Sequence, residues 1–67
     1  MSPEAMEERD RQIRAIESEF PRWEAWQGLV NGLWHARLTG STPPVMVHAE
    51  SPGELREQIR ARIGAMP

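Results

Sequence analysis

The chain has no cysteine, no lysine and no tyrosine among its 67 residues. Without cysteine it can form neither a disulfide nor a thiolate metal site, which fits a reducing compartment. No apolar run approaches the ~20 residues that span a bilayer, and the acidic N-terminus is unlike a signal peptide. We therefore expect a soluble cytoplasmic protein without a membrane partner.

All eight basic residues are arginine, and ten acidic residues bring the formal net charge to −2. A GC-rich coding sequence explains the arginine bias, and so does selection for two-point recognition of carboxylate or phosphate groups. Residues 1–20 are the most acidic part, with six acidic residues against three arginines. Nucleic-acid-binding domains usually carry a basic stripe or a high pI, so this charge pattern disfavours nucleic acid as the partner.

The N-terminal segment has the signals of a helix. Ser2-Pro3-Glu4 combines a capping serine, a proline suited to the first helical position and an acidic residue at the positive end of the helix dipole. An apolar stripe at helical spacing follows, made of Met6, Ile13, Ile16 and Phe20. Pro21 disfavours helical backbone at the residue before it, so we expect a helix over about residues 3–19.

A second helix start, at Ser51-Pro52-Gly53-Glu54, is the clearest local signal in the chain. The serine and the glutamate three residues later form a capping box around a proline at the first helical position. A narrow apolar stripe repeats every four residues, at Leu55, Ile59 and Ile63. Gly64 is the expected C-terminal stop. The pattern predicts a helix over residues 51–64.

Between these helices the sequence predicts three β-strands, over residues 22–27, 33–38 and 45–49. Asn31-Gly32 is a strong signal for a hairpin between the first two strands. Residues 39–44 contain the turn formers and prolines of a loop. The third strand is expected to lie antiparallel to the second, because consecutive strands are usually neighbours.

The predicted fold is therefore an α+β domain with the order α-β-β-β-α. It forms a single domain over residues 1–67, with a helix in 1–20, a sheet in 22–49 and a second helix in 51–64. The sheet is expected to be a three-stranded antiparallel meander. Both helices are expected to pack on one face of it, because a sheet with an apolar face must bury that face.

Alternation along the strands separates the three tryptophans. One predicted face is apolar and consists of Trp23, Ala25, Trp34, Ala36, Leu38, Val45, Val47 and Ala49. The apolar stripes of the two helices are the natural cover for this face. Trp23 and Trp34 are therefore expected in the core.

The opposite face mixes polar and large side chains, namely Glu24, Trp26, Leu33, His35, Arg37, Met46 and His48. Tryptophan, methionine and arginine are enriched in protein interfaces, and tryptophan and arginine are the commonest hot-spot residues. We interpret six of these residues as a binding face: Trp26, His35, Arg37, Met46, His48 and Glu24.

Three structural alternatives compete with this interpretation. Trp26 can cover the hairpin loop through Leu29 or Val30, or the N-terminal helix can pack on the same face. A one-residue slip in the strand register, or a bulge at Gly28, would exchange the two faces.

The sequence shows no arrangement that would support catalysis or hold a cofactor. The serines lie in predicted caps, a helix and a loop, and Glu17 and Glu19 are expected to be no more than part of a solvated helix face. His35 and His48 come close if the second and third strands pair, but a closed zinc site needs four ligands. We therefore predict a non-enzymatic protein without a cofactor or a metal.

Several motifs occur together: Phe20-Pro21-Arg22-Trp23-Glu24-Ala25-Trp26, Trp34-His35-Ala36-Arg37, Pro43-Pro44-Val45, and Ala49-Glu50-Ser51-Pro52-Gly53-Glu54-Leu55-Arg56 followed by Ile59. In this combination the chain resembles, over about residues 13–63, a family of small actinobacterial proteins often encoded near helix-turn-helix regulators. Arg22 stands where many members have glycine. The resemblance implies a cytoplasmic accessory protein whose partner is a transcriptional regulator, and it transfers no catalytic residues.

These observations favour a non-enzymatic protein-interaction or regulatory accessory module that acts through one sheet face. A homodimer is also expected, because that face or an exposed strand edge can self-associate and a small core gains stability from association. The alternative is a weak nucleic-acid-binding domain that uses the same face, with contacts from Arg37, Arg22 and His35.

Overall fold

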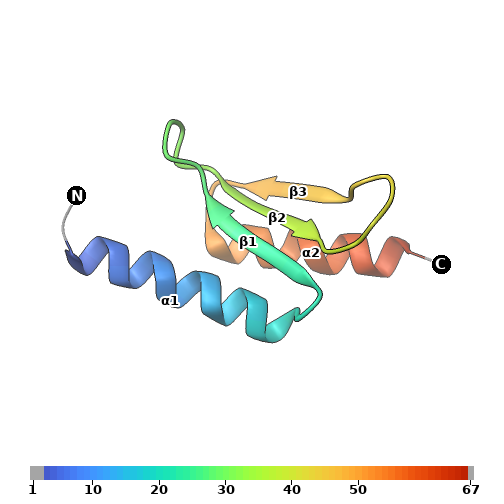
Figure 1. Ribbon diagram of the computed structural model, residues 1–67, viewed down its shortest axis with the longest axis horizontal. Helices are drawn as coiled ribbons and strands as arrows, with labels where there is room; N and C mark the ends of the chain where they lie inside the picture. Colours follow the sequence, from blue (N-terminus) through green and yellow to red (C-terminus); the bar gives the residue numbers. More distant parts are fainter. Residues whose placement is uncertain (1–2, 67) are drawn as a thin grey trace.

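The computed structural model describes residues 3–66, which form two helices and a three-stranded sheet (Figure 1). In chain order the elements are α1 (Pro3–Glu19), β1 (Trp23–Gln27), β2 (Trp34–Leu38), β3 (Met46–Ala49) and α2 (Pro52–Ala65). This is the predicted α-β-β-β-α order, and each strand begins one residue later than predicted. Ser2, the predicted cap of α1, lies outside the described residues. Within residues 3–66, no helix has both the length and the apolar character needed to cross a membrane.

α2 is flanked by residues whose backbone is extended. Ser51 has φ −143° and ψ 159°, and its hydroxyl accepts a hydrogen bond from the Glu54 N–H at 3.2 Å. The serine half of the predicted capping box is therefore present, and Pro52 is the first helical residue. The predicted stop at Gly64 is wrong. That glycine does not adopt a left-handed conformation, so the helix continues past it and Met66 forms the C-cap.

The sheet is an antiparallel meander with the strand order β1-β2-β3, as predicted. The β1–β2 loop closes through a hydrogen bond of 2.8 Å from the Gly28 N–H to the Leu33 carbonyl. Gly32 has φ +70°, a left-handed conformation that glycine adopts without steric cost. The Asn31 side-chain oxygen accepts a hydrogen bond from the Leu33 N–H at 3.0 Å. The predicted Asn-Gly pair therefore stabilises the hairpin through both of its residues.

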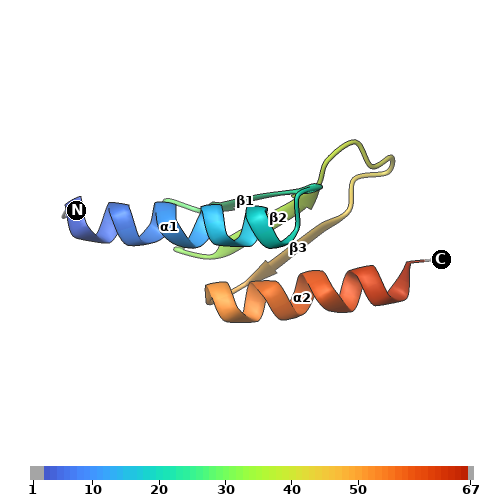
Figure 2. The same cartoon turned by 90° about the horizontal axis from the view of Figure 1, so that it is seen from below.

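Both helices pack on one face of the sheet (Figure 2). The buried core consists of Ile16, Trp23, Ala25, Trp34, Ala36, Val47, Ala49, Leu55 and Ile59. Every strand residue in this core belongs to the face that alternation predicted to be apolar. Trp23 and Trp34 are only 4% and 7% exposed, which confirms that they are core residues.

Alanines in the sheet leave room for the helices to approach. Ala25 and Ala36 lie opposite each other in register, and Ala36 is fully buried. On the helix side, Ile16, Leu55 and Ile59 have no exposed surface. Burying an aliphatic side chain of this size stabilises a fold by ~1.5–3 kcal/mol, so these three side chains are the main apolar attachment of the helices to the sheet.

The ends of both helices project beyond the core. Met6 of α1 is 44% exposed and Ile63 of α2 is 45% exposed, so the prediction that Ile63 covers the sheet is wrong. β3 contains four residues and α2 contains fourteen. These numbers correspond to lengths of about 13 Å and about 21 Å, so the C-terminal part of α2 extends past the strand that it covers (Figure 2).

Candidate protein-interaction face

The six predicted binding residues lie on the sheet face that α1 and α2 leave uncovered, in two rows that cross the strands. The ring row consists of Trp26, His35 and His48, one residue from each strand. The ion-pair row consists of Glu24, Arg37 and Met46, again one from each strand. We call these two rows together the open face. Residues that oppose each other on one face of a sheet have Cβ atoms ~4.5–5.5 Å apart, so the register alone makes each row contiguous.

Ring stacking orders the ring row. The rings of Trp26 and His35 have centroids 5.5 Å apart and planes within 18° of parallel, and the rings of His35 and His48 lie 6.3 Å apart with a tilt of 42°. Separations of this size are typical of favourable aromatic pairs. Trp26 and His35 are half-buried, and His48 is exposed. The imidazole thus covers one face of the indole while part of the tryptophan surface stays accessible.

An ion pair between β1 and β2 defines the ion-pair row. Arg37 Nη2 lies 2.7 Å from Glu24 Oε2, and the two side chains are 48% and 49% exposed. Exposed pairs of this kind usually contribute ~1 kcal/mol or less to stability. In this pair the carboxylate of Glu24 already balances the guanidinium charge of Arg37. Met46 completes the row with 51% of its surface exposed.

Gly28 makes room for the ring row at the end of β1. A Cβ atom at this position would lie 2.9 Å from the Asn31 side-chain oxygen and 3.5 Å from His35 Nε2. The first distance is too short for a Cβ contact, so a larger residue would displace Asn31. Glycine therefore lets the loop asparagine and the imidazole lie close to the β1 backbone.

The structure shows none of the three alternative arrangements considered for Trp26. Leu29 and Val30 are 84% and 101% exposed, so the tryptophan does not bury the hairpin loop. α1 packs on the opposite face, and the register continues without a slip through β1 and β2. Leu29 and Val30 instead form an exposed apolar tip that the sequence patterns did not assign. The sequence signal for this tip was the pair of apolar residues between the turn formers Gly28 and Asn31.

Glu17 has a structural role that contradicts its prediction as a simple surface group. Its Oε2 accepts a hydrogen bond of 3.0 Å from the backbone N–H of Ala25, and its side chain is partly buried. The carboxylate therefore satisfies a donor on the outer edge of β1 and ties α1 to the sheet. Sequence patterns miss this residue because a helix-to-strand contact of this kind leaves no periodicity.

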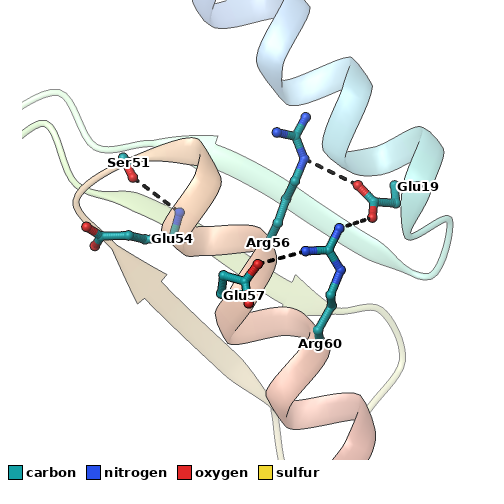
Figure 3. A network of polar contacts seen from close by, with 6 residues as sticks. All are labelled: Glu19, Ser51, Glu54, Arg56, Glu57 and Arg60. Carbon is teal, nitrogen blue, oxygen red and sulfur yellow. Dashed lines mark hydrogen bonds and ion pairs between the residues drawn. The ribbon is translucent and has the colours of Figure 1, made fainter.

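Glu19 corrects the same prediction by joining α1 to α2 through two arginines (Figure 3). Its Oε2 accepts a hydrogen bond from Arg60 at 2.5 Å, and its Oε1 lies 3.3 Å from Arg56 Nε, in an ion pair without hydrogen-bond geometry. Arg60 also pairs with Glu57 at 3.0 Å and lies 5.8 Å from the ring centroid of Phe20. The hydrogen bond and the charge of Glu19 raise the pKa of Arg60. The network links the helices on the side of the sheet away from the open face.

The described residues contain no assembled metal site. Over residues 3–66, no three histidine, aspartate or glutamate side chains are placed to hold a metal ion. An open groove of about 400 Å³ lies between β3 and α2, with Met46 and His48 on the strand side and Ala61 and Arg62 on the helix side. Its lining contains no carboxylate, hydroxyl or thiol, and the groove borders the outer edge of β3.

Comparisons with known proteins identify no relative. No protein-family model, no curated protein and no solved structure matches the chain. The resemblance to the small actinobacterial family stays a prediction.

Proposed function

We propose that this protein is a non-enzymatic interaction module that binds a partner protein through the open face. The observation that carries the proposal is the stacked pair of Trp26 and His35, which crosses from β1 to β2 on the sheet face that α1 and α2 leave uncovered. Tryptophan, arginine and methionine are enriched in protein interfaces, and tryptophan is among the commonest hot-spot residues. The open face combines all three residue types.

The side chains of the open face are ordered before a partner binds. His35 holds the indole of Trp26, and Glu24 holds the guanidinium of Arg37. Immobilising a flexible side chain at an interface costs ~0.5–1.5 kcal/mol, so this prior order lowers the entropic cost of association. The exposed thioether of Met46 adds an adaptable apolar surface beside these side chains.

A protein partner fits the open face better than a nucleic acid does. Affinity for nucleic acid depends on neutralising many phosphates, and the single arginine of the open face is paired with Glu24. Bases can stack on aromatic rings, so weak nucleic-acid binding through the ring row is the competing function. The family resemblance suggests a transcriptional regulator as the protein partner.

A retention experiment tests the proposal with three forms of the full chain: wild type, Trp26→Ala and Met6→Ala. Each form is immobilised and exposed to a cytoplasmic extract of the source cells. Met6 is 44% exposed on α1, so its substitution also removes an exposed apolar side chain, but outside the open face. We expect a protein that the wild type and Met6→Ala retain and Trp26→Ala loses, with all three forms folded.

Two results would contradict this function. One is that no retained protein depends on Trp26 while the Trp26→Ala variant stays folded. The other is binding of a single-stranded oligonucleotide that needs Trp26 and weakens steeply as salt rises, which is the behaviour of a nucleic-acid-binding domain.

A further inference from the structure

The two edges of the sheet differ in how their backbone groups are satisfied. At the β1 edge, the register and the hydrogen bonds to β2 direct the backbone groups of Trp23 and Ala25 outward. Two of the three outward N–H groups are occupied, because Trp23 donates to the Phe20 carbonyl at 2.9 Å and Ala25 donates to Glu17 at 3.0 Å. The third belongs to Gln27, which the same register turns outward at the end of the strand. α1 and the turn that follows it therefore occupy the first three residues of this edge and obstruct a further strand there.

The β3 edge lacks such partners. The Leu38 N–H donates to the Val45 carbonyl at 2.9 Å, which fixes the alternation along β3. The backbone groups of Val47 therefore bond to β2, whereas those of Met46 and His48 point away from the sheet. Among residues 3–66, no group donates to or accepts from these outward atoms. β3 is thus an open edge of the kind that pairs with another strand.

We propose that the occupant of the β3 edge is a second copy of this chain, added antiparallel about a two-fold axis that passes between the Val47 residues of the two copies. Met46 and His48 flank Val47 on either side, so the axis brings each Met46 opposite the His48 of the second copy. Each of these two pairs then exchanges both of its N–H···O bonds, as opposed residues do in an antiparallel ladder. The result is a continuous sheet through both copies.

The free edge is complementary to itself, which favours a second copy over an unrelated strand. Its two free positions are symmetric about one residue, so a copy supplies a donor for every acceptor. The side chains that meet in the ladder, Met46 and His48, include neither a carboxylate nor a guanidinium, so the strand pairing itself opposes no like-charged acidic or arginine groups. A two-fold interface uses the β3 edge of both copies, and Glu17 occupies the central outward donor of β1. Pairing therefore stops at two copies instead of continuing as a fibre.

The groove between β3 and α2 leaves space for the second copy below the sheet. Its helix wall contains Gln58, Ala61, Arg62 and Ala65, and the small side chains of the two alanines allow another α2 to approach. α2 packs beneath both β3 and β2, so it is set back from the two-fold axis by about half of the ~8–10 Å that separates packed helices. Two copies of α2 can therefore lie side by side. A four-residue edge and one groove give less contact than the ~800 Å² per partner of a standard interface. We therefore expect a weak dimer.

This inference goes beyond the proposed function, because it uses the edge of the sheet rather than its open face. Dimerisation would place the two open faces side by side. The His48 end of each ring row would adjoin the Met46 end of the ion-pair row of the second copy. Trp26 lies at the far side of the sheet, so Trp26→Ala should abolish partner binding and leave the dimer intact. Failure of one proposal is thereby distinguishable from failure of the other.

Sedimentation equilibrium of the full chain over a wide concentration series tests the dimer with wild type, His48→Pro and His48→Ala. The His48 N–H points away from β2, so proline there removes a free donor and no hydrogen bond of the ladder. Alanine removes the imidazole and keeps the donor. We expect wild type and His48→Ala to shift from monomer to dimer as concentration rises, and His48→Pro to remain monomeric with unchanged circular dichroism.

Amide hydrogen exchange of the wild type gives a second test that does not depend on whether the proline variant folds. Exchange at Met46 and His48 should slow as the protein concentration rises, whereas exchange at Ala25, whose N–H is already bound to Glu17, should not change. A monomer at all concentrations overturns the proposal. So does a folded His48→Pro variant that dimerises like the wild type, or exchange at His48 that is independent of concentration.

Discussion

The indole ring of Trp26 stacks on the imidazole ring of His35 across the β1–β2 pair, with centroids 5.5 Å apart and planes 18° from parallel. This contact explains why Trp26 is half-buried although it lies on the face without helices. Cross-strand pairs of this kind contribute ~0.2–1 kcal/mol to a sheet. The tryptophan is therefore positioned by its neighbour but is not required for the core.

Trp34→Ala and Trp26→Ala should differ clearly in their effect on stability. Trp34 is 7% exposed in the core, and truncation of a buried tryptophan costs ~3–5 kcal/mol. The Trp26→Ala substitution removes mainly the stacking on His35, so it should lower the free energy of unfolding by about 1 kcal/mol. Urea unfolding followed by circular dichroism measures both values. Equal losses for the two variants would mean that Trp26 belongs to the core and not to a binding face.

Glu19→Gln should lower the melting temperature by more than Glu8→Gln does. Glu19 contacts Arg56 and Arg60 and so links α1 to α2, whereas Glu8 pairs with Arg11 inside α1 only. Removing the Glu19 charge weakens a contact between helices that are distant in sequence. The difference between the two variants should shrink at high salt, because salt screens exposed pairs. If the variants melt alike at low salt, the link between the helices does not contribute to stability.

The strand faces could be predicted from the sequence because side chains in a strand alternate with a period of two. That period placed Trp23 and Trp34 in the core and Trp26 on the open face. The assignment does not change when the predicted end of a strand is wrong by one residue. Periodicity could not predict the roles of Glu17 and Glu19. Their partners lie on other elements, so the contacts arise only when the helices dock on the sheet.

The ends of α2 show the same limit. The capping serine was predictable because Ser51 acts on a backbone group three residues away. The exposure of Ile63 could not be predicted, because it depends on how far α2 extends past the short strand β3. The arrangement of the open face in rows also required the register, which a periodic pattern alone does not fix.

Glu17→Ala should open the β1 edge without unfolding the protein. The substitution leaves the Ala25 N–H without its acceptor, so exchange of that amide with solvent should accelerate by a large factor. Glu7→Ala, on an exposed part of α1, is the matched control and should leave the amide unchanged. Because a freed edge can pair with other chains, Glu17→Ala should also form species larger than a dimer at high concentration. An Ala25 amide that exchanges equally fast in both variants would show that Glu17 does not protect this edge.

Gly28→Ala and Gly53→Ala should change stability in opposite directions. A Cβ atom at position 28 would lie 2.9 Å from the Asn31 side-chain oxygen, whereas one at position 53 would have no heavy atom outside its immediate neighbours within 4 Å. Gly28→Ala should therefore displace Asn31, break its hydrogen bond with the Leu33 N–H and cost about 1 kcal/mol. Gly53 lies in the first turn of α2, where alanine restricts the unfolded chain and should add about 0.5 kcal/mol. Thermal unfolding of the two variants beside the wild type measures both signs, and a Gly28→Ala variant as stable as Gly53→Ala would contradict the tight packing of the loop against β1.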